Sequence, residues 1–193
     1  QSFYNFLNYA DSITVPTKVF LDILIKKKVQ KNKIRIIRSH IDTQKFIPLD
    51  KEEVRKKYNY NNEKIIFYYG GLYEEKGLEV LADSIQLVQK VFPNVLFIIA
   101  PREQISTAQP LAKKIENLNN VIIINENIDV VDYLNLSDVL CLPYKSIIAT
   151  EGNPSCMLEA MACKTPVITT NLPEIREIVD DEKDVLMANP GDP

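Results

Sequence analysis

Two glutamates separated by seven residues, Glu151 and Glu159, carry the clearest chemical signal in the sequence. Between residues 156 and 163, Glu159 is the only charged side chain in an otherwise apolar run. A carboxylate that is buried without a partner is costly, because it loses its hydration without compensation. Glu159 therefore requires hydrogen-bond donors.

The residues before Glu159 form a typical helix start. Asn153 is a preferred cap, and Pro154 is favoured at the first helical position. We expect the helix to begin at Pro154 and to leave unpaired N–H groups, which favour a bound anion, in its first turn. The residues that carry these groups are Ser155, Cys156 and Met157.

A nucleoside diphosphate would fit both features. Its diphosphate can rest on the helix N-terminus while Glu159 accepts hydrogen bonds from the two ribose hydroxyls. Glu151 would then lie beyond the diphosphate, where it can contact the group that the diphosphate carries. The alternative stays open that Glu159 is an exposed helix residue and that Glu151 only stabilises the helix dipole.

A second candidate site is the stretch GGLYEEKG, residues 70–77, which follows an apolar run. Gly70 and Gly71 allow a ligand to approach the backbone closely, and Lys76 offers a compact positive charge suited to phosphate. The spacing matches neither of the common glycine-rich nucleotide motifs. A tight turn with a solvated lysine is therefore the alternative interpretation.

Short apolar runs alternate with helical patterns along the chain. The runs that predict buried strands are residues 13–15, 34–38, 65–69, 95–100, 121–125, 139–143, 166–170 and 185–187. The helical patterns begin near residues 17, 50, 76, 110, 130, 154 and 173. Continuously apolar strands that alternate with helices predict an α/β fold with a doubly wound, Rossmann-like parallel sheet. In such sheets, ligands bind beyond the carboxyl ends of the strands.

Composition narrows the class of protein. The 193 residues are 46% hydrophobic and 25% charged, and the net charge of -3 gives no general reason to bind nucleic acid. The sequence shows no apolar run of about 18 residues and no secretory leader, so we expect a cytoplasmic protein. The three cysteines, Cys141, Cys156 and Cys163, lack metal-ligand spacing, and we expect them to pack as free thiols.

The order of the motifs resembles a known family. YYGGLYEEKG, SDVLCLPY and EGNPSCMLE followed by AMACKTPVI, with SHIDTQKFIP upstream, resemble the retaining group 1 (family 4) glycosyltransferases of GT-B fold. The resemblance implies that residues 34–193 form the C-terminal, nucleotide-sugar-binding domain, and that residues 1–33 are the tail and linker of the N-terminal acceptor domain. Because it also implies a missing N-terminal domain, we expect the isolated fragment to be inactive.

The resemblance also implies roles for individual residues. Glu151 would contact the transferred sugar as the catalytic residue, Glu159 would bind the ribose, and Lys76 would hold the diphosphate of the donor. The family usually has arginine where this chain has Gly71. Arg102 is a candidate replacement by its position after a strand.

The base of the donor is expected near Asn125, Glu126 and Ile128, where backbone contacts dominate. This leaves a UDP-sugar and a GDP-sugar equally open. No Asp-x-Asp pair is present, so we expect the enzyme to require neither a metal nor a cofactor. The hexose-type sugar would pass to an unidentified glycan or lipid acceptor.

Other interpretations stay open. A nucleotide-sugar epimerase of the same fold would need general acid and base groups around the sugar, and a catalytically silent nucleotide-binding module would lack transfer activity. Residues 26–38 hold seven cations, which form either a solvated helix end or a contact with a phosphorylated acceptor or with anionic lipid on the inner membrane face. His40, the only histidine, is expected to be structural or to line the hinge.

Overall fold

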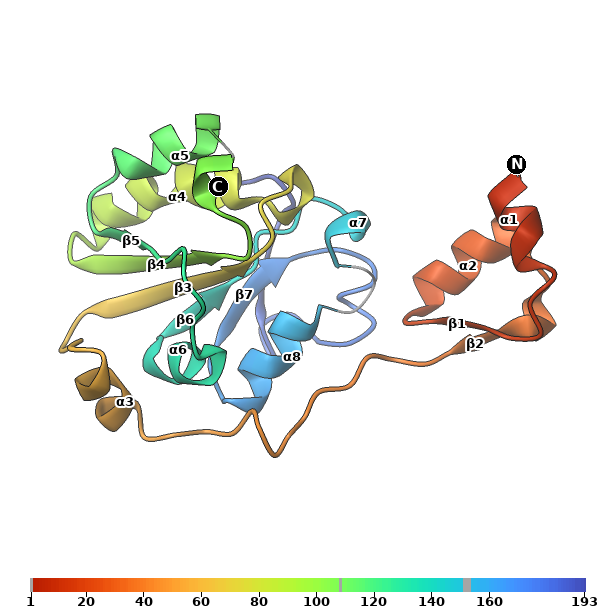
Figure 1. The fold of residues 1–193 in the computed structure, drawn as a ribbon, viewed down its shortest axis with the longest axis horizontal. Helices are drawn as coiled ribbons and strands as arrows, with labels where there is room; N and C mark the ends of the chain where they lie inside the picture. Colours follow the sequence, from red (N-terminus) through yellow and green to blue (C-terminus); the bar gives the residue numbers. More distant parts are fainter. Residues whose placement is uncertain (1, 108, 151–153) are drawn as a thin grey trace.

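One parallel sheet organises most of the chain in the computed structural model, which describes residues 2–107, 109–150 and 154–193 (Figure 1). Its strands are β3 (Lys64–Gly70), β4 (Val95–Pro101), β5 (Val121–Ile123), β6 (Val139–Cys141), β7 (Val167–Thr170) and β8 (Leu186–Ala188). Their order in the sheet is β5-β4-β3-β6-β7-β8, and each neighbouring pair is parallel. The predicted doubly wound α/β fold is therefore confirmed.

Helices cover both faces of this sheet, as Figure 1 shows. The helices of the sheet domain, residues 51–193, are α3 (Lys51–Lys57), η2 (Glu74–Lys76), α4 (Leu78–Val91), η3 (Ile105–Thr107), α5 (Gln109–Glu116), α6 (Val130–Leu136), α7 (Ile147–Thr150) and α8 (Ser155–Ala162). Because side chains alternate along a strand, Phe67 packs in a core with α3, α6 and α8, whereas Tyr68 packs in a second core with α4 and α5. Both ring systems are almost fully buried.

The strand order reverses between β3 and β6. From β3 the chain moves outward to β4 and β5, then returns to β6 on the other side of β3 and continues to β7 and β8. In a doubly wound sheet, such a reversal opens a crevice at the carboxyl ends of the two strands. The glycine turn at residues 70–77 and helix α8 both lie at this edge of the sheet, because they follow β3 and β6.

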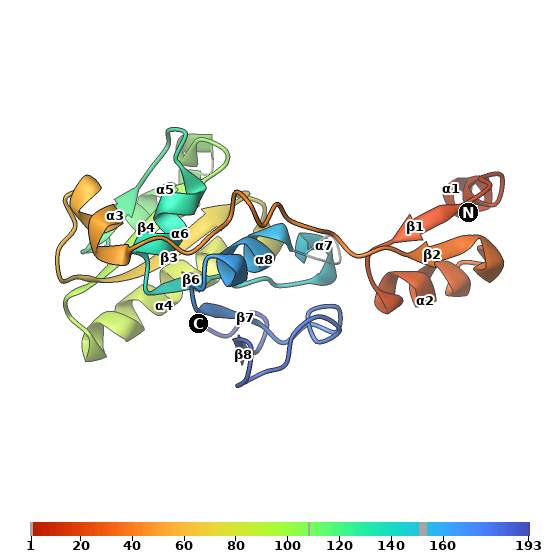
Figure 2. The ribbon, with the colours of Figure 1, turned by 90° about the horizontal axis from the view of Figure 1, so that it is seen from below.

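The N-terminal segment, residues 2–36, forms a separate small unit (Figure 2). Its elements are α1 (Ser2–Leu7), β1 (Ile13–Val15), α2 (Lys18–Lys26), η1 (Lys31–Lys33) and β2 (Ile34–Ile36). Strands β1 and β2 pair in parallel as their own sheet, over a core that contains Val15, Val29 and Ile34. The linker, residues 37–50, then runs to α3. The sequence suggests a domain boundary near residue 33. Strand β2 lies after this boundary but pairs with β1, which lies before it. The division into domains stays a prediction.

Two expectations about local structure are wrong. The pattern from residue 173 predicts a helix, but residues 173–178 form turns, in which Ile175 and Ile178 donate backbone hydrogen bonds three residues back. Tertiary contacts override the helical pattern here, because the Glu174 side chain is drawn into the core and accepts a hydrogen bond from Thr150 Oγ1 at 2.8 Å. The run predicted as buried at 34–38 is exposed after Ile34, and the run at 185–187 buries Val185 but exposes Leu186, since both strands lie at sheet edges. No helix in the described part of the chain is long and apolar enough to span a bilayer.

Candidate functional site

Glu159 lines a cavity of about 370 Å³ beyond the carboxyl ends of β3 and β4. This Glu159 cavity also contains most of the residues singled out in the sequence as candidate ligand contacts, namely Gly70, Arg102, Asn125, Glu126, Ile128, Ser155 and Cys156. Among the other residues that line it are Lys45, Phe46 and Tyr69, which the sequence does not indicate as ligand contacts. The alternative that Glu159 is only an exposed helix residue is therefore not favoured.

The partner of Glu159 within the protein is Tyr69. The Tyr69 hydroxyl donates a short hydrogen bond to Glu159 Oε2. Burial, followed by the nearby Cys156 and Glu159, raises the pKa of Tyr69, so the hydroxyl stays protonated and remains a donor. The Tyr69 ring stacks on Phe67 at 5.3 Å between centroids, which fixes its direction. One carboxylate oxygen of Glu159 is thus held by the protein.

Helix α8 begins one residue later than the sequence predicts. Pro154 has φ of -67° and ψ of 113°, which is extended, so it caps the helix and Ser155 is the first helical residue. The Met157 N–H donates to the Pro154 carbonyl at 3.2 Å, so it is not unpaired as expected. Ser155 and Cys156 remain at the helix start and face the cavity. Glu151 and Asn153 lie outside the described residues.

Lys76 lines a second cavity, of about 420 Å³. The sheet domain contributes Tyr73, Lys76, Arg102, Tyr144, Thr150, Pro154, Ser155 and Cys156 to this Lys76 cavity. The N-terminal segment and the linker contribute Thr14, Val15, Pro16, Ile37 and Ser39. The Lys76 cavity therefore lies between the two parts of the chain.

Lys76 is held by contacts that fix its charge at the cavity wall. Its Nζ donates a short hydrogen bond to the Ala149 carbonyl. It also lies 5.1 Å from the ring centroid of Tyr144 and 5.7 Å from that of Tyr73, within range of cation–π attraction. Because Thr150 and Glu151 follow Ala149 in sequence, Lys76 is anchored to the segment that leads to the first glutamate.

The turn that carries Lys76 depends on Gly77. Gly77 has φ of 74°, and a Cβ built on it would lie 1.8 Å from the Pro143 carbonyl oxygen. Only glycine fits such a close approach between the turn and the end of β6. At Gly71, a Cβ would lie 2.7 Å from the Tyr73 ring, which therefore occupies the space that an arginine at this position would enter.

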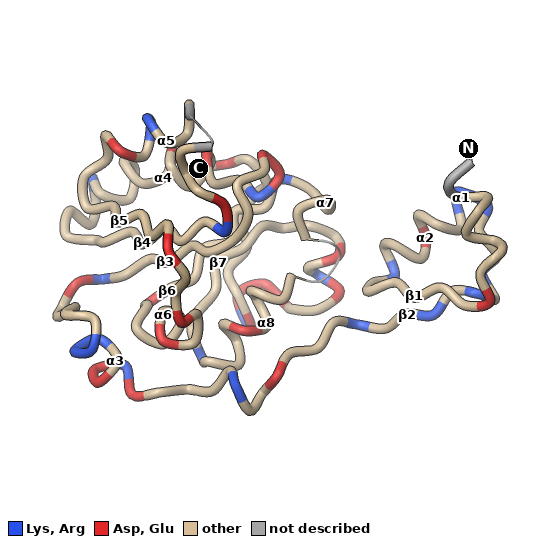
Figure 3. The backbone as a smooth tube through the Cα atoms, in the orientation of Figure 1, with Lys and Arg blue, Asp and Glu red and all other residues tan. Residues whose placement is uncertain are grey.

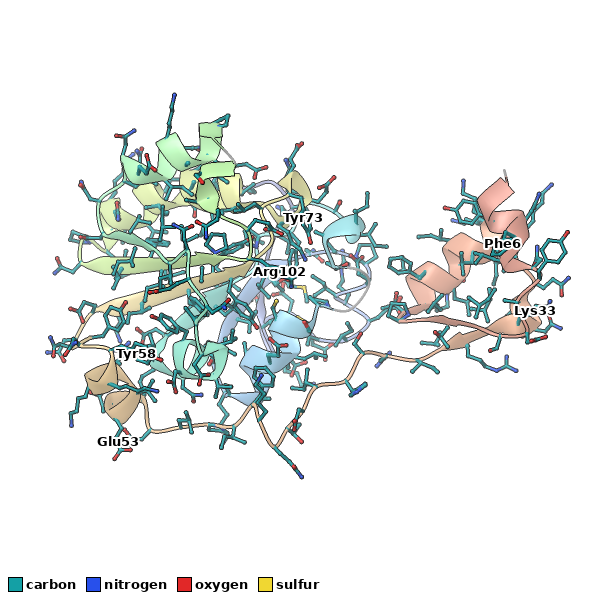
Figure 4. All side chains as sticks on the ribbon, in the orientation of Figure 1. Phe6, Lys33, Glu53, Tyr58, Tyr73 and Arg102 are labelled. Atoms are coloured by element: carbon teal, nitrogen blue, oxygen red, sulfur yellow. The ribbon has the colours of Figure 1, made fainter. Side chains whose placement is uncertain are left out.

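Three residues, Arg102, Ser155 and Cys156, line both cavities. The Arg102 N–H donates to the Gly70 carbonyl at 2.8 Å, which ties the end of β4 to the glycine turn. Figure 4 shows the labelled Arg102 and Tyr73 beyond the ends of β3 and β4. A guanidinium beside a helix N-terminus favours a bound anion such as a diphosphate. The junction of the two cavities thus brings Arg102 and the start of α8 together, and both favour a bound anion.

The three cysteines are free thiols, but they differ in role. Cys163 is buried in the core, and burial raises the pKa of the Cys141 thiol to about 12, as expected for packing residues. Cys156 instead lines both cavities. Burial, followed by the Glu159 charge, raises the pKa of the Cys156 thiol and keeps it in its less reactive form.

Other residues highlighted in the sequence have simpler surroundings. The Asn125 side-chain oxygen accepts the Ile105 N–H at 3.1 Å, so Asn125 shapes the floor of the Glu159 cavity. His40 is exposed in the linker. No group of metal-ligating side chains occurs among the described residues, and independence of metal stays a prediction.

The cations of residues 26–38 are spread over the end of α2, β2 and the linker (Figure 3). Lys33 donates to the Asn8 carbonyl at 2.6 Å, and Arg35 donates to that of Asn32 at 3.0 Å. Lys27 lies over the Tyr4 ring at 5.4 Å. These contacts within the segment agree with a solvated helix end, and a lipid contact stays a prediction.

Residues 50–193 match the family described as glycosyl transferases group 1. An uncharacterised glycosyltransferase of Methanocaldococcus jannaschii is 29% identical over 170 residues, which cover 86% of this chain and 41% of that protein. The capsular polysaccharide biosynthesis glycosyltransferase CapM of Staphylococcus aureus is 26% identical, over 84% of this chain and 43% of its own length. This chain therefore spans less than half of either relative.

Among solved structures, Anabaena HepE in complex with UDP-glucose is similar over 98% of this chain and 53% of its own, with a TM-score of 0.84 and 18% sequence identity. HepE has also been solved with UDP. At this level of identity, the similarity shows that the two proteins share a fold.

Proposed function

Since the chain belongs to the glycosyl transferases group 1 family, we propose that it is the donor-binding portion of a retaining glycosyltransferase. The enzyme would transfer a hexose-type sugar from a nucleotide sugar to a glycan or lipid acceptor. The similarity to CapM, named for capsular polysaccharide biosynthesis, supports a role of this kind.

The observation that carries the proposal is the shared wall of the two cavities, formed by Arg102, Ser155 and Cys156. A nucleotide sugar has a nucleoside and a sugar on opposite sides of a diphosphate. The Glu159 cavity would take the nucleoside, the shared wall the diphosphate, and the Lys76 cavity the sugar. Both volumes, about 370 and 420 Å³, are in the ordinary range for small-molecule pockets.

At the nucleoside end, Glu159 would bind the ribose. Tyr69 holds Oε2, which leaves Oε1 to accept a hydrogen bond from a ribose hydroxyl. The base would lie toward Asn125, Glu126 and Ile128 on the opposite wall. The complexes of HepE with UDP and UDP-glucose make UDP the first nucleotide to test, with GDP beside it.

At the reacting end, the enzyme must stabilise the charge of the departing diphosphate. Lys76, Arg102 and the start of α8 are positive groups held at fixed positions, and they would supply this stabilisation without a metal or a cofactor. Gly71 stands where the family usually has arginine, and Arg102 would supply the positive charge that is missing there. Glu151 would contact the transferred sugar.

The chain alone is expected to bind a donor without transferring its sugar, because reaction between two domains requires closure and acceptor contacts. The decisive experiment uses the full-length protein that contains this chain, with UDP-glucose and GDP-mannose as probe donors. Glu159→Ala should raise the KM for the donor roughly tenfold to a hundredfold, since a hydrogen-bonding charged group is lost. Glu151→Ala should lower kcat with a smaller change in KM.

The exposed Glu182 provides a matched control, and Glu182→Ala should change neither constant. If the effects of the two glutamate variants are exchanged, the donor lies in the opposite direction along α8. If no nucleotide binds to the folded chain, a scaffold protein without a nucleotide pocket is the better description, and the proposed function is wrong.

A further inference from the structure

Glu177 links the sheet domain to the N-terminal segment. It lies in the turns after β7, and its carboxylate accepts the backbone N–H of Lys18 at 2.7 Å and that of Val19 at 2.8 Å. These two residues open helix α2 in the N-terminal segment. The contact joins positions more than 150 residues apart in sequence, across the boundary between the two parts.

The first turn of α2 is satisfied only in part by its own segment. The Thr17 side chain accepts the Phe20 N–H at 3.5 Å, and the Thr17 carbonyl accepts the Leu21 N–H at 3.2 Å. The N–H groups of the first two residues have no acceptor within the helix, as at every helix start. Glu177 supplies both acceptors, and its negative charge suits the positive end of the helix.

The same contact borders the Lys76 cavity. Val15 and Pro16 line that cavity, and Thr17 follows them directly. Thr17, the cap of α2, is 0% exposed, whereas Lys18 after it is exposed and Val19 is half-buried. Fixing the first turn of α2 therefore also fixes the residues that form one wall of the cavity.

We propose that Glu177 is a positioning residue that completes the cap of α2 across this boundary and thereby holds the N-terminal segment closed over the Lys76 cavity. The role assigned to Glu177 is to fix the arrangement of the two parts. It can be tested without any nucleotide, so it does not depend on the proposed function.

The first test is Glu177→Ala in the whole chain. Amide hydrogen exchange at Lys18 and Val19, followed by NMR, should become roughly tenfold faster or more, because two hydrogen bonds to a charged acceptor are lost. Exchange at Ile98, in the middle of β4, should not change. Small-angle X-ray scattering should show a larger radius of gyration as the two parts separate. The exposed Glu182→Ala should behave as the unmodified chain in each measurement.

The second test leaves Glu177 in place and removes one donor. Lys18 is the first residue of α2, where proline is tolerated, and Thr17 before it is extended, with φ of -139° and ψ of 164°. Lys18→Pro therefore deletes one N–H that Glu177 binds and keeps the helix. Lys18→Ala is its matched control, since it loses the exposed ion pair with Asp22 but keeps the N–H.

The expected result is faster exchange at Val19 and a larger radius of gyration for Lys18→Pro than for Lys18→Ala. Equal behaviour of these two variants would overturn the proposal, as would unchanged exchange and scattering in Glu177→Ala. Should Glu177→Ala fail to fold, the comparison of the two Lys18 variants decides alone.

Discussion

The substitution Gly77→Ala tests how the glycine turn positions Lys76. Gly77 has φ of 74°, and a Cβ at this position would lie 1.8 Å from the Pro143 carbonyl oxygen. The obstacle is backbone at the end of β6, so it cannot move away as a flexible side chain would. The turn itself must shift, and Lys76 must shift with it.

The loss of stability expected for Gly77→Ala has two contributions. An alanine at positive φ costs roughly 1–2 kcal/mol in conformational energy. Forcing extra volume into a closely packed place adds about 1–3 kcal/mol. Gly191 separates the two, because it has φ of 81° but a Cβ added to it would meet no atom within 4 Å. Gly191→Ala should show the first contribution alone, and Gly77→Ala both.

Urea unfolding of the two variants and of the unmodified chain measures these free energies. We expect Gly77→Ala to lose about 1–3 kcal/mol more than Gly191→Ala, as the packing contribution requires. It should also weaken UDP binding, because the Lys76 ammonium leaves its place beside Ala149. Equal losses of stability in the two variants would refute the argument that close approach to β6 restricts this position to glycine.

Three further predictions follow from the surroundings of single residues. Burial opposes ionisation of Asp138, but the Ile65 N–H and two cationic side chains outweigh it and lower the pKa of this carboxyl, so its ionised form stabilises the fold. Asp138→Asn should lower the free energy of unfolding by about 1–3 kcal/mol at pH 7. The unmodified chain should lose this stabilisation as the pH falls below roughly 4, whereas the variant should show no such loss, and urea unfolding across pH measures both. Because the pKa of the Cys156 thiol is raised, its alkylation by iodoacetamide should be slow at pH 8 and should become faster above pH 9. UDP should protect the thiol, and mass spectrometry follows the reaction. Fast alkylation at pH 8 would contradict the raised pKa. Gly71→Arg combined with Tyr73→Ala should bind UDP about tenfold more tightly in calorimetry than Tyr73→Ala alone, because an arginine can then enter the space beside residue 71 while both variants lack the contact of the Tyr73 ring with Lys76. Equal affinity of the two variants would argue against a missing cationic contact.

The fold could be predicted because its signals are local. The strands at 65–69 and 95–100 are continuous apolar runs, and the structure extends the first by one residue at each end and the second by one residue at its end. The turns at 173–178 could not be predicted, since their sequence has a helical pattern and only tertiary contacts of Glu174 and Glu177 oppose it. The pairing of β2 with β1 also depends on contacts between distant residues.

The sequence likewise indicates some residues of the candidate site and misses others. Lys76 and Arg102 could be indicated because each follows a strand, where a parallel sheet exposes its ligands, and Glu159 because it is the one charged residue in an apolar run after a helix start. Tyr69 could not, because it belongs to an apolar run that reads as buried strand. Its one signal is its position as the last residue before the glycine turn. Its hydroxyl reaches Glu159 only because α8 packs beside the end of β3.

Calorimetry of the chain with UDP and with 2′,3′-dideoxyuridine diphosphate tests most directly whether Glu159 binds a ribose. The unmodified chain should bind UDP more tightly than the dideoxy nucleotide, since only UDP carries the hydroxyls that Glu159 can accept. Glu159→Ala should weaken UDP binding by about 1.5–3 kcal/mol and remove the difference between the two nucleotides. A Glu159→Ala variant that folds normally and still prefers UDP to the same extent would contradict the account.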